Sequence, residues 1–253
     1  MKYKIPFILF LILTLVYTPV FPQGKGGKKK SDMDLPVAPP SGKINPKPDL
    51  PEPPPEPPEP EEDPPEFAGE PIPSSNSTLV YVIDVSCSMS IGVGPYVDDE
   101  GNTTTGKNRL DRAKAEIRRS IRDLPKNFKF NIIDYDCTMM RWKRKKQLAS
   151  VPNKLSAIGY VDAMRIRGGT GTGFAVALGL ADKEVKSLIL LTDGYPGCYG
   201  GDAFNRHAQM IKAANTQNAI ITVFGVGAAA YGPAGAFCKR IARENGGNFI
   251  GIN

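Results

Sequence analysis

The sequence predicts an α/β fold, in which a mostly parallel sheet carries helices on both faces. Continuous apolar runs, several of them ending at an Asp, are typical of strands that are buried on both sides. Segments with an apolar stripe at helical spacing alternate with these runs, which is the pattern of strand–helix–strand units. The two patterns together indicate a Rossmann-like, doubly wound architecture for residues 77–253.

The first half of this region gives two strands and two helices. The run LVYVID at 79–84 predicts a buried strand, and Phe128 to Asp136 predicts a second one. Between them, the segment 109–124 predicts a helix because its apolar residues recur every three or four positions. Residues 139–142 suit a short edge strand, because the KRKK run that follows would discourage further pairing. A helix is expected over 155–164.

The second half continues the alternation. After GGTGT, which interrupts the helical pattern, we expect a helix at 174–181, a buried strand at 187–192 and a helix at 202–216. A further strand is expected at 219–225. A last helix contains Phe237 and Ile241 and ends at two glycines, and a short strand follows at 248–252.

The N-terminal residues 1–24 read as a targeting segment. Two lysines precede an apolar run of a length that suits either an export signal peptide or an uncleaved membrane anchor. We therefore expect an extracytoplasmic protein of the cell envelope, either membrane-anchored or secreted. The lysines that follow the run favour the reverse orientation, with the domain in the cytosol, as the alternative.

Residues 25–76 predict a disordered spacer that is first Lys-rich and then Pro/Glu-rich. Of the 24 prolines, 16 lie in residues 35–73, where the chain cannot form regular helix or sheet and the acidic residues repel one another. The net charge of +6 conceals this organisation, because the spacer is acidic and residues 74–253 are basic. The basic average is therefore no sign of nucleic-acid binding, for which no motif is present.

Composition excludes several kinds of site. The single histidine, His207, rules out a metal site built from a histidine cluster. Its neighbours predict a position at the boundary of the core. The four cysteines contain no C-x-x-C pair, so a zinc ribbon or a thioredoxin-type redox pair is excluded.

Three polar clusters follow expected strands or interrupt a helical pattern. They contain Asp84, Ser86 and Ser88, then Thr170, then Asp193. Ligands of open parallel sheets bind at the carboxyl ends of the strands, so the three clusters are expected to meet in one crevice. Hydroxyl and carboxylate oxygens suit a hard divalent cation such as Mg²⁺, with Mn²⁺ or Ca²⁺ as alternatives.

The ordered combination VYVIDVSCSMS, GGTGT and LLTDG resembles the three motifs of the von Willebrand factor A (vWA) domain. FNIIDYD and FCKRIARENGG look like the second strand and last helix of bacterial members. The resemblance implies a metal-ion-dependent adhesion site that holds Mg²⁺. In it, Ser86, Ser88 and Thr170 would bind the ion directly, and Asp84 and Asp193 would do so directly or through water. Gly168 and Gly169 would allow close backbone approach, and Thr172 remains an alternative to Thr170.

The sequence also departs from the family pattern. Cys87 stands where the family usually has Gly, and the thiol is expected to add bulk beneath the metal loop. An insertion from about Ile91 to Asn108 is expected on the metal-bearing rim, and it carries three acidic residues, Asp98, Asp99 and Glu100. We expect a Cys198–Cys238 disulfide if the protein is exported, and reduced, buried thiols otherwise.

The sequence therefore predicts a non-enzymatic binding domain on a stalk. It would grip an acidic residue of a protein partner through Mg²⁺, with the membrane contacted by the N-terminal segment and with no nucleic acid or small-molecule substrate. One alternative is a metal-dependent hydrolase with Asp134, Asp136 or Asp202 as general base. The other is a self-plugged scaffold, in which the acidic insertion or the acidic spacer occupies the metal.

Overall fold

A computed structural model describes residues 65–72, 77–198, 200–227 and 231–252. The targeting segment 1–24 and most of the spacer lie outside the described residues, so those predictions stay predictions. Among the residues described, no helix combines the length and the apolar character needed to cross a bilayer.

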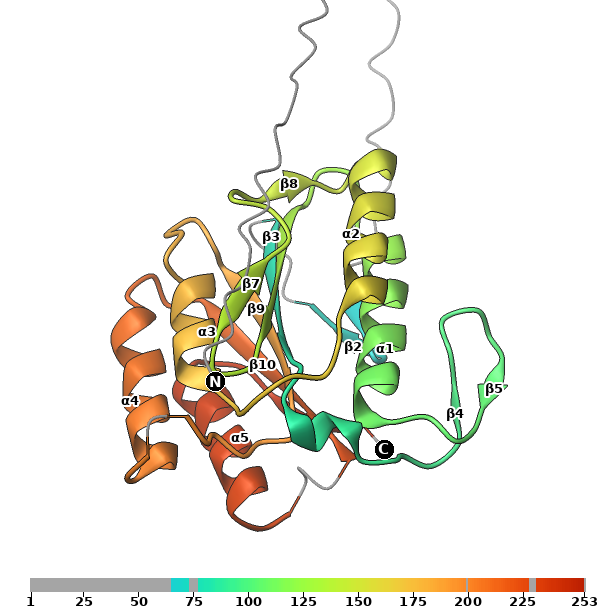
Figure 1. Ribbon diagram of the computed structural model, residues 1–253. Helices are drawn as coiled ribbons and strands as arrows, with labels where there is room; N and C mark the ends of the chain where they lie inside the picture. The colour runs from blue at the N-terminus through green and yellow to red at the C-terminus, as the bar shows by residue number, and fades with distance from the viewer. Residues whose placement is uncertain (1–64, 73–76, 199, 228–230, 253) are drawn as a thin grey trace, which may run out of the picture. The chain divides into compact units, whose positions relative to one another are not determined.

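The centre of the domain is a seven-stranded sheet with helices on both faces (Figure 1). Five of its strands are parallel and run in the order β11-β10-β9-β3-β6, whereas β7 and β8 both pair antiparallel with β6. The fold class predicted from the sequence is confirmed. The strands are β3 (Thr78–Asp84), β6 (Lys129–Tyr135), β7 (Met139–Arg141), β8 (Gln147–Leu148), β9 (Ser187–Thr192), β10 (Ile220–Val226) and β11 (Phe249–Ile252).

Side chains at alternate positions of the strands point to opposite faces of the sheet and form two separate hydrophobic cores. In β3, Tyr81 packs on one side of the sheet and Val82 on the other. Among the described residues, two helices pack on the first side and three on the second. The two are α1 (Arg109–Asp123) and α2 (Val151–Ala163), and the three are α3 (Thr172–Gly179), α4 (Ala203–Ala214) and α5 (Gly232–Glu244). Figure 1 shows these two groups on opposite faces of the sheet.

Most predicted boundaries agree with the structure to within a few residues, and α2 is the main exception. It begins at Val151, four residues before the predicted start, and contains Pro152 in its first turn. Proline is tolerated there because the first N–H groups of a helix have no intrahelical partner. Trp142, the residue after β7, stacks on Phe130 as edge-strand packing.

The predicted end of the spacer at residue 76 is wrong. A small hairpin of β1 (Glu66–Phe67) and β2 (Glu70–Pro71) belongs to the folded domain. Phe67 is 1% exposed and its ring lies 4.4 Å from that of Phe224 in β10. Ile72 is also buried in the same core. The apolar residues Phe67 and Ile72 give this stretch the burial that the Pro/Glu-rich sequence around it lacks.

The insertion between β3 and α1 forms the short turn η1 (Cys87–Ser90) and a hairpin of β4 (Tyr96–Val97) and β5 (Thr103–Thr104). Figure 1 shows the hairpin beside α1. The Asp99 carboxylate is bound by Arg118 and Arg122 of that helix. The Asp98 carboxylate accepts backbone N–H groups of its own turn. These contacts contradict the alternative in which Asp98 or Asp99 plugs the metal site.

Candidate functional site

The carboxyl ends of β3 and β9 place two carboxylates at the same edge of the sheet. Asp84, the last residue of β3, is fully buried. Its Oδ1 accepts the Ser86 N–H at 2.9 Å, and its Oδ2 accepts the Thr192 hydroxyl at 2.7 Å. Burial raises the pKa of Asp84 to about 6, and the negative charge of Asp193 adds to this rise. Such a carboxylate gains much from a nearby cation.

The two serines of the first motif lie together above Asp84. The hydroxyl oxygens of Ser86 and Ser88 are 3.2 Å apart. The intervening Cys87 is exposed, so the expectation that its thiol lies beneath the loop is wrong. Its backbone N–H donates to the carbonyl of Gly168 at 3.0 Å. This bond ties the first motif to the GGTGT segment.

The third motif supplies a carboxylate that is only half satisfied. Asp193 is 2% exposed, and its Oδ2 accepts Nη1 of Arg109 at 2.8 Å. The same Nη1 lies 3.4 Å from the carbonyl oxygen of Ser88. The other oxygen of Asp193, Oδ1, is buried and finds no hydrogen-bond partner within the described part of the chain. An orphaned carboxylate oxygen in this position is costly unless a cation or water satisfies it.

The GGTGT segment is held by hydrogen bonds from the loop after β9 and from β6. The backbone carbonyl of Thr170 accepts the N–H groups of Gly197 and Cys198, at 2.9 and 3.2 Å. Thr172 is fully buried at the start of α3, and its hydroxyl accepts the Tyr135 hydroxyl at 3.2 Å. This engagement favours Thr170 over Thr172 as the candidate ligand.

Gly168 and Gly169 are required by close packing. Gly168 has a positive φ of 21°, and a Cβ there would lie 2.7 Å from Oδ2 of Asp136. A Cβ on Gly169 would lie 2.9 Å from the sulfur of Cys137 and 3.4 Å from that of Cys198. The close approach that the motif predicts is therefore an approach to protein atoms behind the loop.

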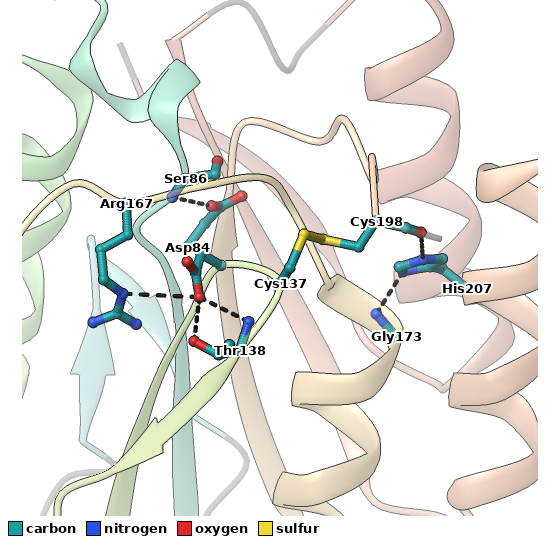
Figure 2. Close-up of a disulfide and its surroundings, with 9 residues drawn as sticks. Asp84, Ser86, Cys137, Thr138, Arg167, Gly173, Cys198 and His207 are labelled. Carbon is teal, nitrogen blue, oxygen red and sulfur yellow. Dashed lines mark hydrogen bonds and ion pairs between the residues drawn. A yellow bond between two sulfur atoms is a disulfide. The ribbon is translucent and has the colours of Figure 1, made fainter. Parts of the chain in front are cut away.

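Those two sulfurs form a disulfide, which corrects the predicted Cys198–Cys238 pair. Figure 2 shows the Cys137–Cys198 bond joining the loop after β6 to the loop after β9, with a Cα separation of 5.6 Å. Cys238 is a free thiol whose pKa is raised to about 12 by burial in the core. The sequence did not predict this pair, because Cys137, Cys198 and Cys238 all lie near the same edge of the sheet and position in the chain does not show which two sulfurs meet.

His207 contacts both the loop that contains Cys198 and the start of α3. Its Nδ1 accepts the N–H of Gly173 at 2.9 Å, and its Nε2 lies 3.4 Å from the carbonyl oxygen of Cys198 (Figure 2). The residue is fully buried, so the predicted boundary position is wrong. Burial lowers the pKa of the imidazole, although the contact with Cys198 acts in the opposite direction.

The carboxylates considered as a general base are already engaged. Asp134 is buried and bound by the Tyr160 hydroxyl and the Arg167 guanidinium. The Asp136 carboxylate accepts both the N–H and the hydroxyl of Thr138, at 2.7 and 2.6 Å. Asp202 caps the N-terminus of α4. None of them is singled out as a catalytic base.

The oxygen atoms gathered at this edge fit a small divalent cation. The two serine hydroxyls lie 3.2 Å apart, the charges of Asp84 and Asp193 interact, and the backbone bond from Cys87 to Gly168 brings the Thr170 segment to the first motif. Oδ1 of Asp193, which has no partner among the described residues, is available as a ligand. Within the described ranges, no group of three or more His, Cys, Asp or Glu side chains is placed to hold a metal ion. Any ion here would therefore depend on the hydroxyl oxygens.

Comparison with known proteins gives partial matches. No protein-family model matches the sequence. Heavy chain 4 of inter-alpha-trypsin inhibitor from Mus musculus is 29% identical over 142 residues, which are 51% of this chain and 13% of that protein. The von Willebrand factor A domain-containing protein 3B of Homo sapiens is 31% identical over 91 residues, 36% of this chain and 7% of that protein. The chain thus spans a small part of the length of these relatives.

Solved structures show the same fold. A von Willebrand factor type A protein from Catenulispora acidiphila has a TM-score of 0.54 at 21% identity, covering 70% of this chain and 38% of that one. The pilus adhesin SpaC from Lactobacillus rhamnosus GG has a TM-score of 0.52 at 16% identity, covering 69% and 28%. The sheet order, the three motifs at its carboxyl edge and these relatives together show that the chain carries a von Willebrand factor A-like domain.

Proposed function

We propose that this domain binds an acidic residue of a protein partner through a Mg²⁺ ion, and that it does so outside the cytoplasm as an adhesion or protein-interaction domain. The ion would be held by Ser86, Ser88 and Thr170, with Asp84 and Asp193 binding directly or through water. The ion supplies a Lewis-acidic centre for the partner's carboxylate. The residues of the chain orient it and neutralise part of its charge.

The observation that carries this proposal is Oδ1 of the buried Asp193, which has no hydrogen-bond partner among the described residues, while Oδ2 of the same carboxylate shares Arg109 with the Ser88 carbonyl. A purely structural turn would leave no carboxylate oxygen unsatisfied, since its burial costs on the order of 1–3 kcal/mol. The donor set is also poor in negative charge. A divalent ion bound there would keep a net attraction for an acidic group from outside.

An extracytoplasmic location is supported by the chemistry of the cysteines. The Cys137–Cys198 disulfide suits an oxidising compartment, whereas cytosolic proteins rarely keep such bonds. The apolar run within residues 1–24 supplies an export signal or anchor, and the Pro/Glu-rich spacer supplies reach. One protein of similar fold, SpaC from Lactobacillus rhamnosus GG, is a pilus adhesin, which is consistent with this role.

The proposal is tested by capturing partners from the native cell envelope on the immobilised protein, with Mg²⁺ and with EDTA. Asp84→Ala and Ser86→Ala should abolish the Mg²⁺-dependent capture, because each removes an oxygen at the ion. Ser90→Ala is the matched control, since Ser90 lies on the same turn and is exposed, and its hydroxyl donates to the Cys87 carbonyl on that turn. Capture that persists unchanged in EDTA would exclude a metal bridge.

We further propose that the domain binds without catalysis. Each of the three aspartates considered as a general base already has another role. Asp134 pairs with Arg167, Asp136 accepts the Thr138 hydroxyl, and Asp202 caps α4. Hydrolysis of generic phosphoesters that disappears in Asp193→Ala would overturn this part and leave the metal site in place.

A further inference from the structure

We propose that Arg109 is a built-in cation that weakens the binding of a divalent ion at the candidate metal site. The occupancy of the site would then respond to the concentration of the ion. This inference rests on the proposed metal-dependent function and adds a residue that the three motifs do not contain.

The position of Arg109 is fixed by the start of α1. Asn108 caps the helix by accepting the N–H of Asp111, and the Asp111 carboxylate accepts the Asn108 N–H in return. Arg109 is therefore the first residue of the helix, and it is only 9% exposed. Its Nη1 reaches Oδ2 of Asp193 at 2.8 Å and the Ser88 carbonyl at 3.4 Å.

The guanidinium has little room to move away. Gly227, which follows β10, has a φ of +68°, and a Cβ on it would lie 2.6 Å from Nε of Arg109. The arginine side chain thus passes directly over a backbone that has no side chain of its own. Among the residues that the structure describes, Nε is buried without a hydrogen-bond partner. Packing, together with the bond to Asp193, holds the positive charge in the crevice.

This charge changes the balance of the site. Asp84 and Asp193 bring two negative charges, and Arg109 cancels one of them before any ion arrives. An incoming divalent ion therefore meets a weaker attraction and also repels the guanidinium across a poorly screened interior. Because Oδ1 of Asp193 is unpartnered, the ion can share this carboxylate with Arg109. We therefore expect Arg109 to lower the affinity of the site for the divalent ion without preventing the ion from binding.

The test is direct binding of Mn²⁺ alone, followed by the electron paramagnetic resonance of free Mn²⁺. Arg109→Gln removes the charge and keeps a donor for Asp193, so it should bind Mn²⁺ at least about tenfold more tightly than the unaltered protein. Arg109→Lys keeps the charge and should stay close to the unaltered protein. Arg112→Met is the matched control on the next turn of α1, because its partner Glu116 remains paired with Arg119.

Each result separates the two proposals. Unaltered or weaker Mn²⁺ binding by a folded Arg109→Gln protein overturns the role of Arg109 while the metal site stands. Equal tightening in Arg109→Gln and Arg112→Met also overturns it, since general charge would then explain the effect. If neither the unaltered protein nor Arg109→Gln binds Mn²⁺, the proposed function fails and this inference with it. Circular dichroism confirms folding, and Arg109→Met replaces the Gln variant if that one does not fold.

Discussion

His207 shows how a single buried side chain can connect the candidate site to pH. Its Nδ1 accepts the Gly173 N–H and therefore carries no proton, so Nε2 is the donor toward the Cys198 carbonyl. A second proton on the ring would turn the acceptor into a donor that faces another donor. The structure thus requires a neutral imidazole, and this agrees with the lowered pKa that burial gives His207.

We predict that His207 makes the domain less stable in mild acid. The pKa of this histidine is lowered in the folded state, so as the pH falls below about 6.5 the unfolded chain takes up a proton that the folded chain refuses. The stability from this residue is complete above that pH and declines below it, by at most about 1.4 kcal/mol per pH unit. Urea unfolding between about pH 7 and about pH 5 measures this slope. His207→Asn keeps an acceptor without titrating, so the variant should lose less stability than the unaltered protein between these two pH values; equal slopes would contradict the prediction.

At the scale of elements, the β4–β5 hairpin is held to α1 by charge. The Asp99 carboxylate is almost inaccessible and accepts Arg118 and Arg122 together. Burial alone would raise the pKa of Asp99, but the hydrogen bonds from these two arginines outweigh it and lower the pKa to about 2. The hairpin is therefore attached most firmly when Asp99 is ionised.

We predict that Asp99→Asn loosens the hairpin and lowers the free energy of unfolding by about 1–2 kcal/mol, since it removes a charged acceptor from two partly exposed arginines. Because the folded pKa lies below the unfolded one, this stability is present above about pH 4 and is lost as the pH falls toward about 2. Denaturant unfolding gives the difference, and hydrogen exchange locates it in residues 96–104. The neighbouring exposed Glu100→Gln is the control. A stability loss of equal size in both variants would contradict the specific role of Asp99.

Elements whose signal is local were predictable from the sequence, and elements that depend on a distant partner were not. The residues of β3 from Leu79 to Ile83 are all apolar because both faces of the strand are buried, and this is visible in the chain itself. The hairpin containing Phe67 has no such signal, because it is ordered by the aromatic ring of Phe224 far along the chain. The Cys137–Cys198 pair likewise depends on which loop folds over which, across 61 residues.

At the scale of the whole molecule, the same division applies to the candidate site. Parallel strands bring their carboxyl ends to one edge, so Asp84 and Asp193 were expected to be neighbours, and the structure places them together. Arg109 was not predicted, because it reaches the crevice from α1 and belongs to no motif. Topology predicts where strand ends meet, but it does not predict which long side chain will enter from a neighbouring helix.

The extent of the folded domain gives a prediction for the molecule as a whole. Phe67 lies between the rings of Tyr81 in β3 and Phe224 in β10, so residues before position 77 complete the core on the α1 side of the sheet. Phe67→Ala should lower the free energy of unfolding by about 3–5 kcal/mol, because it opens a cavity among buried aromatic side chains. Glu70→Ala, on the exposed second strand of the same hairpin, should change it by less than about 0.5 kcal/mol. Denaturant unfolding of the full chain measures both. A Phe67→Ala loss no larger than that of Glu70→Ala would show that the hairpin is an appendage of the spacer and that the domain begins at residue 77.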